Sequence, residues 1–242
     1  MNIYKLDYRK LIKISGVDSV KFLQNILSND IGEINERSLQ YNLLLTPQGK
    51  ILYDFFIFKS SQDFYLDCHA KFLEDIKKKF QIYKLHLDVQ IESSEVSVFI
   101  SNKDLKTCCY PDPRHSILGY RYYDFVKSKT VNTHLEIKML KIYDGHRLQC
   151  LVPEFGIDFM PEEFFPLHLE MDKLNAISFN KGCYVGQEVT ARMNYRGKIK
   201  KYLEYINLND FKISDKEIIK DDKKIGIILK TYDTGALALL KK

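Results

Sequence analysis

Residues 41–58 read YNLLLTPQGKILYDFFIF, two apolar runs separated by the polar stretch TPQGK. Pro47 and Gly49 suit a tight turn, because proline presets its own φ and glycine accepts a positive φ. The two runs therefore predict an antiparallel hairpin, and the alternating segment QDFYLDCH predicts a third strand beside it. The next stretch, AKFLEDIKKKFQIYK, repeats its apolar residues at helical spacing and predicts an amphipathic helix.

The rest of the chain continues this mixture of strands and helices. LIKIS predicts a strand before the hairpin, and the apolar stripe of SVKFLQNIL predicts a helix. LDVQIESS and VSVFIS predict two further strands, HLEIKMLKIYDGHRLQC a helix, and the residues from Lys200 onward a group of short strands. In TCCYPDPRHSILGYRYY, Pro111 and Pro113 predict a loop without regular structure. The expected fold class is α+β.

Composition narrows the class of protein. Hydrophobic residues make up 45% of the chain and charged residues 29%, as in a folded globular protein. The net charge of +5 permits a polyanionic partner. No RNA-recognition, helix-turn-helix or zinc-finger pattern occurs, so we expect no direct binding of nucleic acid. No apolar run is long enough to cross a bilayer, and MNIYKLDYRK lacks the apolar core of a signal peptide, so we expect a cytoplasmic protein without a membrane partner.

The five cysteines are Cys68, Cys108, Cys109, Cys150 and Cys183. An odd number at irregular spacing argues against a disulfide framework. No CxxC pair occurs, so we expect neither a permanent metal site nor a permanent iron–sulfur site within one chain. Four of the five are most simply small buried apolar residues.

Cys183 is different, because it lies among glycines and cations in FNKGCYVGQEVTARMNYRG, residues 179–197. Glycines allow backbone N–H groups to approach a thiolate, and Lys181 and Arg192 would favour its charge. The residues alone also permit a cysteine that packs beneath a turn. A hydrolase with a Cys–His pair has no positive sign in the sequence, and for Glu188 a bond to the turn's own backbone is favoured over a role as general base.

The string KGCYVGQEVTAR, followed by RG at 196–197, resembles the signature of the YgfZ family. This family is related to the glycine-cleavage T-protein and includes the mitochondrial iron–sulfur assembly factor. Further segments are similar to the family: ISGVDSVKFLQNILSNDI, LLLTPQGKILYDFFIF, YPDPRHSILGYR (typical of alphaproteobacterial members) and YDGHRLQCLVPEFGIDFMPEEFFP.

The resemblance implies a cloverleaf fold like that of the T-protein. A split α/β domain that binds folate takes residues 1–47 and 131–195 and carries the signature. A ferredoxin-like α+β insert takes residues 48–130, and a short C-terminal domain like a β-barrel takes residues 196–242.

The resemblance also implies a function. It points to an accessory protein that binds tetrahydrofolate and supports assembly or repair of iron–sulfur enzymes, including tRNA-modifying ones. Its partners would be folate and iron–sulfur assembly or client proteins, with an iron–sulfur cluster held only in transit. Cys183 would then act as a transient thiolate or in redox chemistry. The alternatives are a folate-dependent aminomethyltransferase of the T-protein class and a non-catalytic scaffold, and an assembly factor is favoured over an enzyme.

The resemblance assigns candidate site residues. The frame around Cys183 consists of Lys181, Gly182, Tyr184, Gly186, Gln187, Glu188, Arg192 and Gly197. The expected folate contacts are Tyr143, Arg9, Asn25, Asn29, Asp30 and Asp54.

Two positions depart from the related proteins. The T-protein hairpin carries paired acidic residues, whereas this chain has Tyr53 beside Asp54. Related proteins have a glutamate after the proline where this chain has His168, with Glu170 as the nearest substitute. The first departure argues against aminomethyl transfer, and the second removes one expected contact to a pterin.

Overall fold

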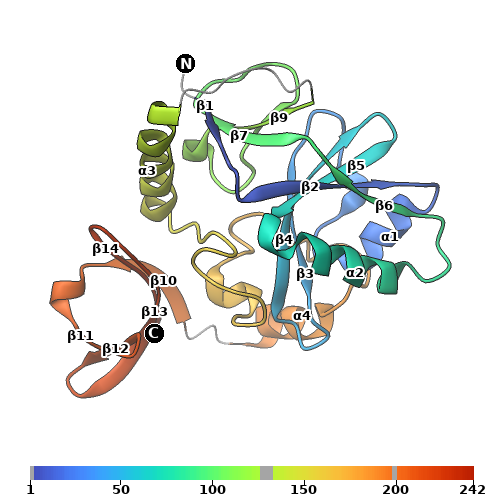
Figure 1. Cartoon of the computed structure of the whole chain (residues 1–242). Helices are drawn as coiled ribbons and strands as arrows, with labels where there is room; N and C mark the ends of the chain where they lie inside the picture. Colours follow the sequence, from blue (N-terminus) through green and yellow to red (C-terminus); the bar gives the residue numbers. More distant parts are fainter. Residues whose placement is uncertain (1–2, 126–132, 198–200) are drawn as a thin grey trace.

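The computed structural model describes residues 3–125, 133–197 and 201–242, and for residues 133–139 the backbone alone. The described residues form three antiparallel sheets, and helices lie between and outside them (Figure 1). Among the described residues, no helix has both the length and the apolar character needed to span a bilayer. The α+β fold class expected from the sequence is confirmed.

The first sheet has the strand order β3-β4-β5-β2-β6. Its strands are β2 (Arg9–Ser15), β3 (Gln40–Leu45), β4 (Ile51–Ser60), β5 (Asp63–His69) and β6 (Gln90–Ser94). Residues 51–58 of β4 are all buried, so this strand is covered on both of its faces. Helices α1 (Ser19–Ile26) and α2 (Leu73–Lys84) complete this layer. The Phe80 ring of α2 contacts Phe22 of α1 and Phe55 of β4, with centroids 5.5 and 5.7 Å away.

The second sheet has the order β1-β7-β9-β8. Its strands are β1 (Ile3–Lys5), β7 (Ser97–Ser101), β8 (Cys109–Pro111) and β9 (Tyr120–Asp124). Residues 107–123 are therefore not the irregular loop expected from their prolines. Pro111 ends β8, at the edge of the sheet, and the 3-10 helix η3 (Ser116–Leu118) connects this strand to β9. Helix α3 (Thr133–Gln149) lies beside this sheet (Figure 1).

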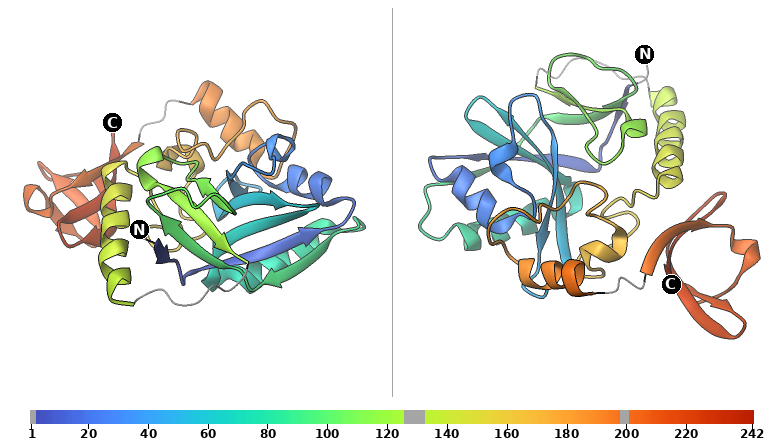
Figure 2. Two further views of the ribbon diagram at one scale, coloured as in Figure 1. Left: turned by 90° about the horizontal axis from the view of Figure 1, so that it is seen from above. Right: turned by 180° about the vertical axis from the view of Figure 1, so that it is seen from behind.

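The chain then crosses back to the first sheet. The 3-10 helix η4 (Pro166–Leu169) and helix α4 (Gln187–Arg196) follow, and α4 lies at the outer edge of the molecule (Figure 2). The remaining short 3-10 helices are η1 (Ile31–Glu33), η2 (Ala70–Phe72) and η5 (Leu208–Asp210).

The third sheet belongs to the C-terminal residues and has the order β10-β14-β13-β12-β11. Its strands are β10 (Lys201–Ile206), β11 (Lys212–Ser214), β12 (Glu217–Lys220), β13 (Lys223–Tyr232) and β14 (Gly235–Lys241). This C-terminal sheet curls to one side of the other two (Figure 2). The boundary expected at residue 47 passes between β3 and β4, which are hydrogen-bonded neighbours, while the division into three domains stays a prediction.

Candidate functional site: an exposed cysteine, an amide groove and a buried charge cluster

The signature loop presents Cys183 to solvent. Cys183 and Gly182 are exposed, whereas the following Tyr184 is buried. The Tyr184 ring packs into the main core and anchors the loop on its inner side. The thiol is therefore accessible to a molecule in solution, and the structure excludes the alternative that this cysteine packs beneath a turn.

Lys181 fastens the same loop to the end of α1. Its ammonium group donates hydrogen bonds to the carbonyl oxygens of Gln24, Leu27 and Asn29 at 2.8, 2.6 and 2.9 Å. These carbonyls belong to the last turn of α1 and the residues after it, where a helix has no partners of its own. Burial lowers the pKa of Lys181 to about 8, and Asp30 only partly offsets this effect. The Lys181 ammonium group therefore binds carbonyls at the end of α1 and does not stabilise the thiolate, as the sequence predicts it would.

The glycines of the signature allow the β3–β4 turn to pack against the start of α4. Gly186 has a φ of +80°, and a Cβ on it would lie 2.5 Å from the Thr46 carbonyl oxygen. A Cβ on Gly49 in the turn would lie 2.8 Å from Cβ of Val189. Both positions therefore exclude any side chain, and the hairpin turn supports the helix that follows Cys183.

The remaining frame residues lie on or at the ends of α4. Gln187 is its first residue, and Gly197 follows its last turn, where its N–H bonds to the Met193 carbonyl. Glu188 and Arg192 form an exposed ion pair of 2.6 Å one turn apart. Arg192 thus also has a partner other than the thiol.

An open groove of about 600 Å³ begins next to the signature loop. We call it the amide groove, and it is lined by Asn29, Glu33, Leu39, Gln40, Tyr41, Pro113, Asn175, Ile177, Ser178, Phe179 and Asn180. The Asn29 side chain joins its walls, donating to the carbonyls of Tyr41 and Asn175 at 3.1 and 2.8 Å. Asn180 precedes Lys181 directly, so the groove and the cysteine loop share one stretch of chain.

A buried group of ionised side chains lies behind Tyr41. This charge cluster consists of Arg9, Asp54, Asp67, Asp112, Arg114, Arg121 and Glu154, all buried. Arg9 donates to Asp67 at 2.6 Å and to Asp54 at 3.1 Å. Arg121 also donates to Asp67, at 2.9 Å.

Arg114 connects the cluster with the amide groove. It donates to Asp112 at 2.9 Å and to Glu154 at 2.8 Å. Its guanidinium carbon lies 5.6 Å from the centroid of Tyr41, a groove residue. Arg114 thus stands between Glu154 and the groove wall.

The three guanidinium groups of the cluster all lie near one aromatic ring, that of Phe56. The guanidinium carbons of Arg121, Arg114 and Arg9 lie 3.5, 4.7 and 5.2 Å from the centroid of the Phe56 ring. Cation–π attraction to this one ring offsets part of the repulsion among the three. The Tyr143 hydroxyl accepts a bond of 2.6 Å from Arg114, and the Tyr41 hydroxyl donates to Asp54 at 3.1 Å.

The cluster contains three guanidinium groups and four carboxyl groups, so acid is in excess. Burial acts to raise the pKa of Glu154, but Arg114, Arg9 and Arg121 outweigh it and hold the pKa at about 2. Burial raises the pKa of Asp54, Arg9 opposes that shift, and Glu154 adds to it. Oε1 of Glu154 is buried without a hydrogen-bond partner among the described residues, although Arg9 is 3.6 Å away. This oxygen can accept a hydrogen bond from a ligand.

The structure does not bring the six expected folate contacts together in one place. Asn29 lines the amide groove, and the neighbouring Asp30 accepts the Gly32 N–H and caps η1. Arg9, Asp54 and Tyr143 belong to the charge cluster or bond to it. Asn25 is exposed on α1 and lines neither the groove nor the cluster in the part of the chain that is described.

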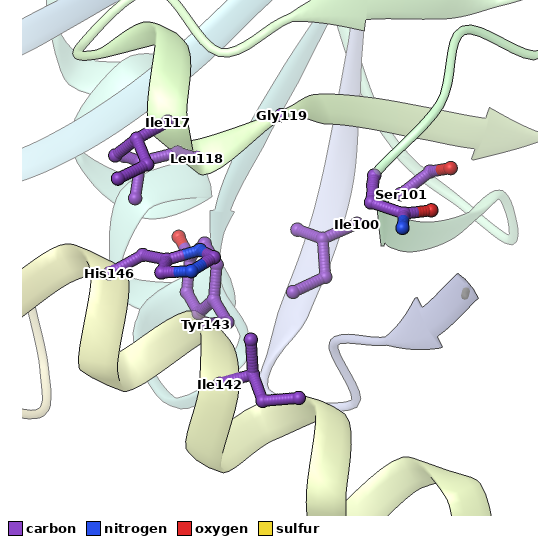
Figure 3. A pocket seen from close by; sticks show the side chains of 9 residues that line it. Ile100, Ser101, Ile117, Leu118, Gly119, Ile142, Tyr143 and His146 are labelled. Atoms are coloured by element: carbon purple, nitrogen blue, oxygen red, sulfur yellow. The ribbon is translucent and has the colours of Figure 1, made fainter. Parts of the chain in front are cut away.

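Tyr143 also borders a small cavity of about 70 Å³ between α3 and η3. Figure 3 shows Tyr143 and His146 of α3 facing Ile117 and Leu118 of η3. Ligand sites for molecules of pterin size take several hundred Å³, so this cavity is too small to be one. The part of Tyr143 that belongs to the candidate site is therefore its hydroxyl, which accepts a hydrogen bond from Arg114.

The two departing positions lie outside the charge cluster. The Tyr53 ring is buried against Phe155, edge to face at 6.2 Å. His168 in η4 meets Phe165 edge to face at 5.4 Å. Burial lowers the pKa of His168, and the nearby Lys201 adds to this effect, so the imidazole is neutral at pH 7. A neutral imidazole offers one acceptor nitrogen and no negative charge, whereas a carboxylate offers two acceptor oxygens.

Sequence reasoning named Arg9 and Asp54 of the cluster but missed the other five members, Asp67, Asp112, Arg114, Arg121 and Glu154. Arg121 lies between tyrosines in a strand, and a charged residue in such a place signals a buried ion pair. Its partner Asp67 is 54 residues away, and no local pattern joins the two.

Comparison with known proteins finds relatives whose names agree with one another, although no family model matches the chain. A mitochondrial iron–sulfur cluster assembly factor IBA57 homolog from Pyricularia oryzae is 30% identical over 219 residues, 81% of this chain and 54% of that protein. The IBA57 protein of Mus musculus is 26% identical, over 85% of this chain and 66% of the mouse protein. The tRNA-modifying protein YgfZ of Blochmanniella pennsylvanica is 24% identical, over 86% of this chain and 72% of that protein. The chain thus spans between half and two thirds of the first two relatives.

The fold has a solved counterpart in the glycine cleavage system aminomethyltransferase T of Bartonella henselae. The TM-score is 0.70 at 14% identity, and the match covers 99% of this chain and 78% of that one. This agreement confirms the T-protein-like fold expected from the sequence.

The fungal and mouse relatives are named as mitochondrial proteins, and this contradicts the cytoplasmic location expected from the sequence. Free cysteines indicate a reducing compartment without distinguishing one such compartment from another. Relatives that include both bacterial and mitochondrial proteins, the signature at 181–197 and the T-protein-like fold agree on one assignment. These similarities support membership of the chain in the family of YgfZ and of the iron–sulfur cluster assembly factor IBA57.

Proposed function

We propose that this protein supports the assembly or repair of iron–sulfur clusters, including those of tRNA-modifying enzymes, and that Cys183 is its working thiol. The observation that carries the proposal is the exposure of Cys183 on a loop that Lys181, Tyr184 and Gly186 hold in place. An exposed thiolate can ligate iron of a cluster that a partner protein delivers or receives. One thiolate does not hold a cluster, so the other ligands come from that partner.

The same exposure also permits the redox role, in which the Cys183 thiolate exchanges with a disulfide of a client protein. Both roles require an accessible sulfur and a partner that docks beside α4. Both are lost when the sulfur is removed, so one substitution tests them together.

We further propose that the amide groove and the cluster behind it bind a reduced folate. The groove offers the aromatic ring of Phe179 and the amides of Asn29, Gln40 and Asn175, which suit a face and the edge of a pterin. Glu154 supplies an unpartnered carboxylate oxygen in a cluster with excess acid, and a pterin edge is rich in N–H donors. These residues fit the ligand, and a bound folate would supply a one-carbon carrier or a reductant.

Glu154 is fully buried, so a ligand reaches it only after Arg114 and Tyr41 have moved. The groove itself is open and does not need that movement. The proposal therefore has two steps, in which the amides of the groove bind first and the carboxylate of Glu154 engages second.

The thiol is tested in a strain that lacks the corresponding gene. We expect the wild-type protein and Cys150→Ala to restore the activity of an iron–sulfur enzyme, whereas Cys183→Ala fails. Cys150 is a matched control, because it is a partly exposed cysteine outside the signature. Full restoration by Cys183→Ala would remove the proposed role of the thiol.

Folate binding is tested by calorimetric titration with tetrahydrofolate under exclusion of oxygen. We expect binding by the wild type and weaker binding by Asn180→Ala, with Asn194→Ala unchanged because Asn194 is exposed on α4 outside the groove. No binding at millimolar ligand would leave a scaffold without folate. Transfer of a one-carbon unit from a donor to tetrahydrofolate would instead establish the aminomethyltransferase alternative.

A further inference from the structure

The loop that carries Glu154 is held from the C-terminal sheet. Residues 151–160 follow α3, and Leu151 begins them in a left-handed conformation with a φ of +54°. The Glu154 N–H donates to the Asp158 carboxylate at 2.7 Å, and the Asp158 N–H donates back to the Glu154 carbonyl at 2.9 Å. The position of Asp158 thus sets the backbone position of Glu154.

Asp158 in turn is fixed by two side chains from different parts of the chain. Arg147, near the end of α3, forms a buried ion pair with it. Tyr232, the last residue of β13, donates its hydroxyl proton to the other carboxylate oxygen and accepts a bond of 2.7 Å from Arg147. Burial raises the pKa of Tyr232, Arg147 opposes this and Asp158 adds to it, so the hydroxyl keeps its proton at neutral pH.

Elsewhere the C-terminal sheet and this loop enclose open space. A cavity of about 410 Å³ separates residues 157–164 from the β12 and β13 region. Lys141 and Asp233 also pair between α3 and the end of this sheet, but both side chains are largely exposed, so solvent screens their attraction. The hydroxyl of the half-buried Tyr232, bonded to the buried Asp158 and Arg147, is therefore the stronger polar link across this boundary.

We infer that Tyr232 is a positioning residue that couples the docking of the C-terminal sheet to the placement of the Glu154 carboxylate. The inference rests on the ligand role proposed for Glu154. When the sheet docks, Tyr232 completes the partners of Asp158, and Asp158 holds the Glu154 N–H. Because coupling between two sites is reciprocal, a ligand on Glu154 also tightens the docking of the C-terminal sheet.

The test compares Tyr232→Phe, which removes one oxygen atom, with Tyr205→Phe. Tyr205 is the matched control, since its hydroxyl bonds to Thr234 within the C-terminal sheet at 2.8 Å. We expect Tyr232→Phe to weaken tetrahydrofolate binding at least about fivefold, the lower end of usual coupling. We also expect faster amide hydrogen exchange in residues 154–158 without ligand, and slower exchange in β13 of the wild type when ligand is added. Tyr205→Phe should change none of these.

Unchanged exchange in residues 154–158 of Tyr232→Phe, with unchanged affinity, overturns the inference. If the wild type binds no tetrahydrofolate, the proposed folate function fails, and exchange without ligand still decides whether Tyr232 positions the loop. Asp158→Asn serves as a second variant, in which we expect the same residues to exchange faster. Circular dichroism of each variant confirms that the fold is retained.

Discussion

The Lys181 ammonium group and the Leu27 carbonyl are joined by a hydrogen bond of 2.6 Å across 154 residues of sequence. The lysine of the signature thereby ends α1, and the cysteine two positions later faces solvent. A residue that sequence reasoning places beside a reactive thiol as a charge is, in the folded chain, the anchor of the loop that presents the thiol.

Lys181→Met should destabilise the protein by about 1–3 kcal/mol, because three carbonyls at the end of α1 lose a charged donor. The measurement is the free energy of unfolding in urea. Lys173→Met is the control, since Lys173 makes an exposed pair with Glu170 and should change stability by less than about 0.5 kcal/mol. Equal stability of both variants would show that the anchor contributes nothing.

Lys181 also predicts a dependence of stability on pH. Its pKa is lowered to about 8 in the folded protein from 10.5, so between these values the unfolded chain binds more protons. The contribution of Lys181 to the free energy of unfolding therefore rises from pH 8 to pH 10.5. The stability of the wild type minus that of Lys181→Met, measured at intervals across this range, should increase with pH. A constant or falling difference would contradict the lowered pKa.

The two glycines nearest Cys183 should respond differently to a methyl group. Gly186→Ala places a Cβ 2.5 Å from the Thr46 carbonyl oxygen at a positive φ, and should cost about 1–3 kcal/mol or more. Gly182→Ala meets no atom within 4 Å and should lie within about 0.5 kcal/mol of the wild type. Thermal unfolding of the two variants side by side separates the effects, and similar losses would show that the tight approach of Gly186 to the hairpin is absent.

Arg121→Met should be among the most destabilising single changes in the chain. Arg121 is fully buried, bonds to Asp67 and lies over the Phe56 ring. Removing one partner of a buried ion pair leaves the other charge buried without compensation, which lowers the free energy of unfolding by about 3–5 kcal/mol. Arg37→Met is the control, because Arg37 is exposed. An Arg121→Met protein as stable as this control would mean that the pair of Arg121 with Asp67 contributes nothing to stability.

Sequence patterns predicted the regular elements well where the pattern is local. The hairpin of β3 and β4, the helices α1 and α2 and the strands after Lys200 all follow from periodicity and turn residues. Between residues 107 and 123 two prolines masked the strands β8 and β9, because Pro111 lies at the end of an edge strand where its missing N–H costs little. The wrong prediction for residues 107–123 thus has a specific physical cause.

The candidate site was predictable only in its linear part. Cys183 and its glycines lie in one string, and resemblance to a family identified them. The charge cluster could not be found this way, because Arg9, Asp67 and Glu154 meet only through the pairing of β2 with β5 and the return of the chain after α3. Arg9 and Asp54 were named individually, but no local pattern in the sequence joins Arg9 to Asp67 or Glu154.

The charge cluster also has a consequence for the order in which the chain is made. Asp67 bonds to Arg9, which precedes it, and to Arg121, which follows it by 54 residues. The Tyr123 hydroxyl in β9 also donates to Asp67, so a nascent chain that ends before β9 contains only one of the three side-chain partners of this carboxylate. Closing the core around it at that stage would bury an incompletely paired charge. All strands of the first sheet are thus synthesised well before Arg121 is available to pair with Asp67. The synthesis of β9 therefore decides when the core around Asp67 can be completed.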